Sequence, residues 1–178
     1  MTAIFNDTLH SWQNFYFMVG GASASLIGLM LIALSLGQHL VTDKTRAQVE
    51  AFATPSVLYF VSALLIACAM LVPDYAPTVL GIIFMAGGAL GLLRSSSHIR
   101  QLIRAAIEHQ DFTWWDWLAQ IILPVAGYVL LILDGVGFLV DQYPLAFAGV
   151  CMAMILLLIS AIANTWSLVI WIIEQPRP

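Results

Sequence analysis

The sequence predicts an all-α integral membrane protein with five transmembrane helices, folded as one domain over residues 1–178. Of its residues, 61% are hydrophobic and 9% are charged, against roughly 25% charged in a typical soluble domain. Crossing a hydrocarbon core of about 30 Å takes roughly 20 helical residues. Apolar runs near that length cover residues 15–36, 54–72, 77–93, 118–140 and 144–173. A soluble fold of this size could not bury so much apolar surface.

The first run is expected to remain as a spanning helix. The fourteen residues before it contain no Lys or Arg, and the run is too long for the apolar part of a signal peptide. Gly20, Ala24 and Gly28 recur every four residues, and small residues at this spacing let helix backbones approach closely in lipid. The spacing predicts a contact face, either within the bundle or between chains.

The second run contains Cys68, and the other cysteine, Cys151, falls in the fifth run. Neither belongs to a Cys-x-x-Cys pair, so no disulfide framework or thiol redox motif is expected. Both are interpreted as core packing residues.

The third run repeats the small-residue spacing at Gly87, Gly91 and Ser95. Residues 94–110 then alternate apolar and polar positions at helical spacing, which predicts an interfacial amphipathic helix between the third and fourth spans. Its Arg100 and Arg104 are expected to meet lipid headgroups.

The fourth run holds Asp134, the one acidic residue that hydropathy places deep in the bilayer. A carboxylate there is costly and is a functional-site hypothesis by default. The same helical face carries Gln120, Pro124, Gly127, Leu131 and Phe138, and Asp141 continues it to the outer surface. Pro124 frees a backbone carbonyl that neighbouring helices or water commonly satisfy.

Asp134 has no basic residue at its expected depth, because the nearest, Arg94, belongs to the opposite side of the midplane. Without a cation nearby, desolvation disfavours the charged carboxylate. Three states remain open: a neutral carboxyl bonded to a group such as Ser23, an ionised one lining a wet path, or one holding a cation. Asp134, Asp141, Gln120 and Ser23 therefore form a candidate ion or proton site.

The fifth run carries a polar stripe of Ser160, Asn164 and Ser167 at helical spacing. These side chains are expected to face other helices, with Asn164 bridging helices by hydrogen bonding.

The basic residues predict the orientation. Lys and Arg concentrate in cytoplasmic loops, and one assignment, with the N-terminus outside and the C-terminus inside, accounts for all six: Lys44, Arg46, Arg94, Arg100, Arg104 and Arg177. We expect a bacterial inner-membrane location.

Several functional classes find no support. The chain lacks a phosphate-binding glycine loop, a nucleophile elbow and a close pair of carboxylates, so an enzyme is not expected. Its net charge of −4 argues against nucleic-acid binding. His39 and His98 could approach each other and ligate haem or a metal, but a fitted second shell would also be needed, and we expect no cofactor.

Three hypotheses of function follow. The first is an assembly or regulatory component that acts through helix contacts with copies of itself or another membrane protein. The second is an oligomeric channel or a proton- or cation-coupled permeation protein that uses Asp134. The third is a cofactor-binding membrane protein that uses His39 and His98.

Overall fold

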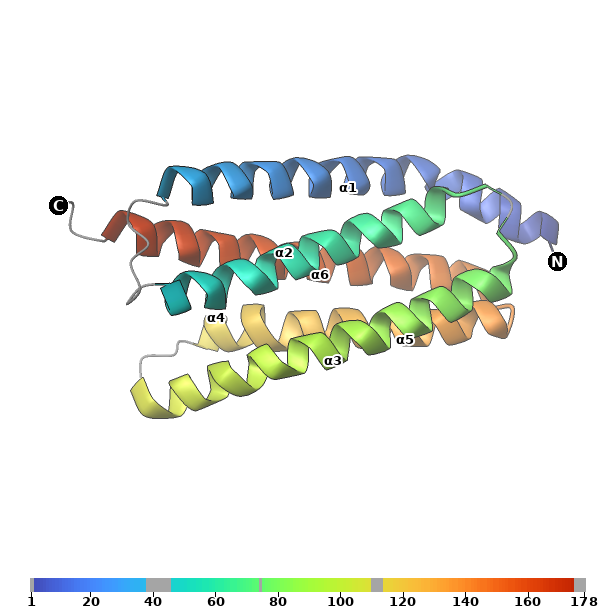
Figure 1. Cartoon of the computed structure of the whole chain (residues 1–178). Coiled ribbons are helices and arrows are strands. Elements are labelled where there is room, and N and C mark those ends of the chain that lie inside the picture. Colours follow the sequence, from blue (N-terminus) through green and yellow to red (C-terminus); the bar gives the residue numbers. More distant parts are fainter. Residues whose placement is uncertain (1, 38–45, 74, 110–113, 175–178) are drawn as a thin grey trace.

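The computed structural model describes residues 2–37, 46–73, 75–109 and 114–174 (Figure 1). Its elements are α1 (Thr2–Gly37), α2 (Arg46–Leu71), α3 (Pro77–His109), α4 (Trp114–Trp117), η2 (Leu118–Ile122), α5 (Leu123–Leu139) and α6 (Tyr143–Glu174). All regular elements in these residues are helical, which confirms the predicted all-α class.

Five stretches of the described helices are long and apolar enough to span a membrane. They cover Phe5–Gly37, Ala53–Leu71, Pro77–Ser96, Leu118–Leu139 and Tyr143–Ile170. The main difference from the sequence prediction is the first span, because α1 begins at Thr2, ahead of the apolar run. The chain is therefore an integral membrane protein by the length and composition of its helices.

The long helices run side by side, with α6 between the others (Figure 1). Helix α1 packs on α2 and α6, α2 packs on α6, α6 packs on α5, and α5 packs on α3. Along α6, Val150, Ala153, Met154 and Leu157 are completely buried. The core of the bundle therefore follows α6, and α3 is joined to it mainly through α5.

Glycines allow α3 and α5 to approach backbone to backbone. A Cβ atom added at Gly81 would lie 2.7 Å from the Gly135 carbonyl oxygen, and one added at Gly135 would lie 2.7 Å from the Gly81 carbonyl oxygen. One added at Gly88 would lie 2.9 Å from the Tyr128 carbonyl oxygen. No larger residue fits these positions while the helices keep their separation.

The fourth span begins with a π-helical turn, η2, which ends two residues before Pro124. In this register Leu123 N–H donates to the Leu118 carbonyl five residues back, so the Ala119 carbonyl would pair with residue 124, which as proline has no N–H. The Ser160 hydroxyl of α6 donates to the Ala119 carbonyl at 2.6 Å. A neighbouring helix thus satisfies the carbonyl that Pro124 leaves open.

The segment predicted to lie at the membrane interface is the last part of α3. Helix α3 continues without a break from the apolar span to His109. The side chains of Arg100 and Arg104 lie outside the part of the chain that the structure describes. Their contact with headgroups stays a prediction.

Candidate functional site

The helical face that the sequence assigns to Asp134 is buried against α6. Gln120, Pro124, Gly127, Leu131, Asp134 and Phe138 are all buried. A Cβ added at Gly127 would lie 3.2 Å from Leu157 Cγ, so this part of the face is packed against side chains of α6.

The Asp134 carboxyl group rests directly on the backbone of α6 at Gly149. A Cβ added at Gly149 would lie 1.8 Å from Asp134 Oδ1 and 2.5 Å from Asp134 Cγ. Asp134 is only 7% exposed. The missing side chain of Gly149 is therefore what gives the carboxyl group room inside the bundle.

One oxygen of this carboxyl group has no partner. Asp134 Oδ2 is buried and makes no hydrogen bond to the described residues. Tyr16 of α1 reaches this part of α6, because its hydroxyl donates to the Phe147 carbonyl at 3.3 Å, two residues before Gly149. A carboxyl group packed between α5 and α6 thus has an unused acceptor, which can take up a proton.

Ser23 does not supply that partner. Its side chain is completely buried, but its hydroxyl donates to the Val19 carbonyl of its own helix at 2.8 Å. Ser23 also lies about 10 Å further along α1 than Tyr16, at 1.5 Å per residue. Tyr16, rather than Ser23, is the hydroxyl-bearing residue of α1 near Asp134.

Asp141 lies apart from Asp134, in the turn between α5 and α6. It is exposed and has a left-handed φ of 62°, a backbone conformation that aspartate adopts more readily than most residues. Its carboxylate accepts a hydrogen bond from the Tyr143 hydroxyl. The two acids therefore share a helical face without forming a pair.

An aromatic cluster is formed near the end of α5 by Phe5 of α1, Phe138 of α5, and Tyr143 and Phe147 of α6. The Phe5 ring centroid is 5.4 Å from that of Tyr143 and 5.6 Å from that of Phe147, and the Phe138 centroid is 5.2 Å from that of Phe147. All four rings are buried. These rings therefore fill the interior of the bundle one helical turn after Asp134, toward the end of α5.

The polar residues predicted to form one stripe on α6 differ in their hydrogen-bond partners. Ser160 makes a contact between helices, at Ala119, whereas the Ser167 hydroxyl donates to Ala163 of its own helix at 3.1 Å. Asn164 is 3% exposed, and its Oδ1 has no hydrogen-bond partner among the described residues. Gln120 is buried in η2.

In each of the two predicted small-residue faces, some residues pack within the chain and others do not. Gly20 packs inside the chain, since a Cβ there would lie 3.0 Å from Ala67 Cβ, whereas Ala24 and Gly28 are exposed. On α3, a Cβ at Gly91 would lie 2.2 Å from the Tyr128 ring, whereas one at Gly87 would meet nothing within 4 Å.

Ser95, the third member of the α3 series, is completely buried. Its hydroxyl lies 3.2 Å from the Tyr59 hydroxyl of α2. This hydrogen bond joins α2 to α3, so Ser95 makes an internal contact.

The histidine hypothesis falls on residues that the structure describes incompletely. His39 lies outside the described residues, and His98 is described only by its backbone in α3. Among the described residues, no group of three or more His, Cys, Asp or Glu side chains is placed to hold a metal ion.

Sequence reasoning missed the residues that shape the surroundings of Asp134. Gly149 and Tyr16 are separated from it in sequence, and neither belongs to a spacing pattern that points to an acid. Gly81 and Gly88, which lie seven residues apart on one face of α3, could have been recognised as a packing pair. Sequence alone offers no equivalent signal for Gly149.

Searches against protein families, curated proteins and solved structures gave no match for this chain. Its function is therefore inferred from its own geometry.

Proposed function

We propose that this protein assembles with copies of itself in the membrane through α1, and acts as an assembly or regulatory component. The observation that carries the proposal is the outward face of α1, formed by Gly21, Ala24, Ser25 and Gly28. All four are exposed, and a Cβ added at Gly21 or Gly28 would meet nothing within 4 Å.

Among the described residues, nothing packs against the open sides of Gly21 and Gly28. A glycine within a helix costs about 1 kcal/mol relative to alanine, and lipid tails do not require it. Glycine and small polar residues at this spacing are typical of helix–helix interfaces in membranes. The span of α1 also buries the smallest share of its apolar window, 22% against 33% to 44% for the others.

Ser25, the polar residue of this face, can be buried in a helix–helix contact that excludes water. The Ser25 hydroxyl donates to the Gly21 carbonyl at 2.9 Å, so its donor is satisfied within α1. A second helix can then approach without burying an unsatisfied hydroxyl donor, which would be unfavourable in an apolar environment.

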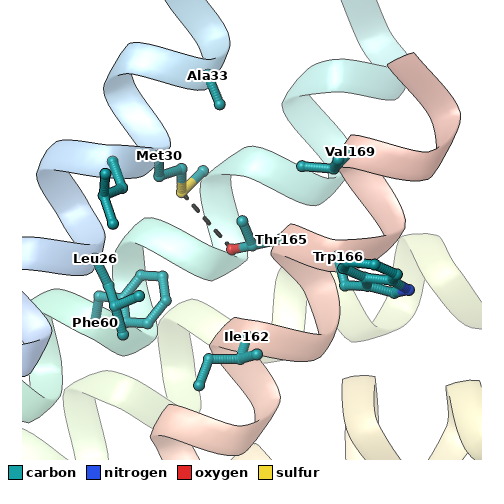
Figure 2. A pocket seen from close by; sticks show the side chains of 9 residues that line it. Leu26, Met30, Ala33, Phe60, Ile162, Thr165, Trp166 and Val169 are labelled. Atoms are coloured by element: carbon teal, nitrogen blue, oxygen red, sulfur yellow. Dashed lines mark hydrogen bonds between the residues drawn. The ribbon is translucent and has the colours of Figure 1, made fainter. Parts of the chain in front are cut away.

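A groove of about 280 Å³ lies beside this face, between α1 and α6 (Figure 2). Leu29, which follows Gly28, is 61% exposed at its edge, and Trp166 on α6 is 65% exposed. Inside the groove the Thr165 hydroxyl lies 4.0 Å from Met30 Sδ. The groove offers a recess for a large apolar side chain of the second copy.

Cysteine crosslinking in native membranes tests this proposal. In a chain carrying Cys68→Ala and Cys151→Ala, Ala24→Cys should form a disulfide dimer, because a twofold contact brings the same position of both copies together. The control Ala89→Cys, on the exposed surface of α3, should not. Adding Gly21→Leu and Gly28→Leu should suppress the Ala24→Cys dimer. Equal crosslinking at positions 24 and 89 would contradict the proposal.

We further propose that the chain lies in a bacterial inner membrane with its N-terminus outside and the 94–110 segment at the cytoplasmic interface. The distribution of Lys and Arg over the loops supports this orientation. Labelling of cysteines placed at position 75, in the turn before α3, by an impermeant reagent in intact cells tests it. Labelling only after the cells are opened would reverse the orientation.

A second candidate function is proton or cation transfer at Asp134. It is supported by the buried Oδ2 atom without a partner. Asp134→Asn should abolish flux in proteoliposomes, whereas the matched change Asp141→Asn, at an exposed acid, should leave most of it. Flux that is absent from the unmodified protein, or unaffected by Asp134→Asn, would remove this candidate.

A further inference from the structure

A second groove, of about 450 Å³, lies between α2 and α3, with α5 behind it. Its walls include Leu65 of α2 and Leu90 of α3, which are 62% and 66% exposed. Because both leucines belong to membrane spans, the groove opens sideways, toward the acyl chains of the bilayer.

Packing elsewhere in the bundle leaves this groove open. Helix α2 packs mainly on α1 and α6, and α3 packs mainly on α5, so the two walls contact each other little. Gly87 lines the groove, and a Cβ added there would meet nothing within 4 Å. The absence of a side chain at Gly87 therefore widens the groove where a larger residue would narrow it.

The groove has polar groups at defined places. Within its wall, the Ser62 and Tyr128 hydroxyls form a hydrogen bond with each other at 2.8 Å. Arg94 lines one end, two residues before the apolar span of α3 ends at Ser96. A long basic side chain at this depth extends toward the headgroup region.

The dimensions match one leaflet of a bilayer. Along α3, the lining runs from Ile83 to Arg94, about 16 Å at 1.5 Å per residue. A hydrocarbon core is about 30 Å thick, so the groove covers roughly half of it. It is apolar toward the midplane and positively charged at the headgroup level.

We propose that this groove binds one anionic phospholipid from the leaflet on the Arg94 side. An acyl chain lies along Gly87 between α2 and α3, and the headgroup phosphate pairs with the Arg94 guanidinium. Guanidinium groups recognise phosphate by paired hydrogen bonds, which distinguishes this site from general contact with surrounding lipid. The proposal does not depend on assembly through α1.

Native mass spectrometry of the purified protein in detergent tests the site, with phosphatidylglycerol and phosphatidylcholine of identical acyl chains added in equal amounts. We expect the unmodified protein to retain phosphatidylglycerol about fivefold better, the factor expected for one arginine near an anionic lipid. Arg94→Gln should remove this preference, and Arg94→Lys, which keeps the positive charge but not the paired hydrogen bonds, should keep only part of it. Equal retention of the two lipids by the unmodified protein would overturn the proposal.

Filling the groove tests the acyl-chain position. Gly87→Leu should reduce retention of both lipids. Ala89→Leu, which also introduces a leucine on α3 but at an exposed position outside the groove, should not. Circular dichroism checks that both variants fold. If Gly87→Leu does not fold, Ala69→Leu on the α2 wall provides an independent block. Retention by a folded groove variant equal to that of Ala89→Leu would also overturn the proposal.

Discussion

Two regions of this bundle carry glycines on one helix face but use them differently. At the α3–α5 contact, Gly81 and Gly88 lie against the backbone of α5, with no space for a Cβ. On the outward face of α1, Gly21 and Gly28 are exposed and have open space around them. The glycines of the α3–α5 contact are buried in packing within the chain. The glycines on the outward face of α1 leave a surface to which another helix can bind.

Small-residue spacing therefore indicates that a helix can be approached closely, but it does not identify the partner. The adjacent residues Gly20 and Gly21 illustrate this point. Gly20 faces Ala67 of α2, and Gly21 faces away from the chain, because successive helical residues differ by about 100° in direction. Which of them becomes internal depends on where α2 lies.

The largest expected effect is at the α3–α5 contact. Gly88→Leu should lower the free energy of unfolding in SDS-titrated micelles by about 3 kcal/mol, because the new side chain collides with Ile132 and the Tyr128 carbonyl. The matched change Gly87→Leu, one residue earlier and in open space, should lower it by less than about 0.5 kcal/mol. Equal losses in the two variants would mean that α3 does not pack on α5 in this way.

An intermediate effect is expected at the contact between Asp134 and Gly149. Gly149→Ala should destabilise the protein by about 1 to 2 kcal/mol, because the added methyl group overlaps the Asp134 carboxyl group. Combining it with Asp134→Ala should recover at least about 1 kcal/mol relative to the sum of the single changes, since the methyl group then fills vacated space. Additive losses in this double-mutant cycle would show that the two residues are not in contact.

The smallest effect distinguishes the two sides of α1. Gly20→Ala should reduce the free energy of unfolding by about 1 kcal/mol net, because the new Cβ would lie 3.0 Å from Ala67 Cβ and this overpacking outweighs the helix-propensity gain of alanine. Gly21→Ala should leave it unchanged or raise it by up to about 1 kcal/mol through helix propensity. Both are measured at a dilution that separates the copies. A loss at position 21 as large as that at position 20 would place Gly21 in an internal contact.

Much of the site on α5 could be predicted from periodicity. The residues from Gln120 to Phe138 that the sequence assigns to one face are indeed buried, because an apolar helix in a bundle turns its small and polar side chains inward. The partner of Asp134 could not be predicted in the same way. Gly149 and Tyr16 come near it through the packing of α6 and α1, which local spacing does not encode.

The membrane class, the helical content and the candidate membrane spans follow from composition and from the length of apolar runs, so they could be predicted before folding is considered. Helix packing, in contrast, sets which small residues face inward, places the Asp134 carboxyl group on Gly149, and leaves a groove between α2 and α3 beside Arg94. These features depend on the rotation and pairing of whole helices. In lipid, that choice is made by close packing between faces, which no single helix specifies alone.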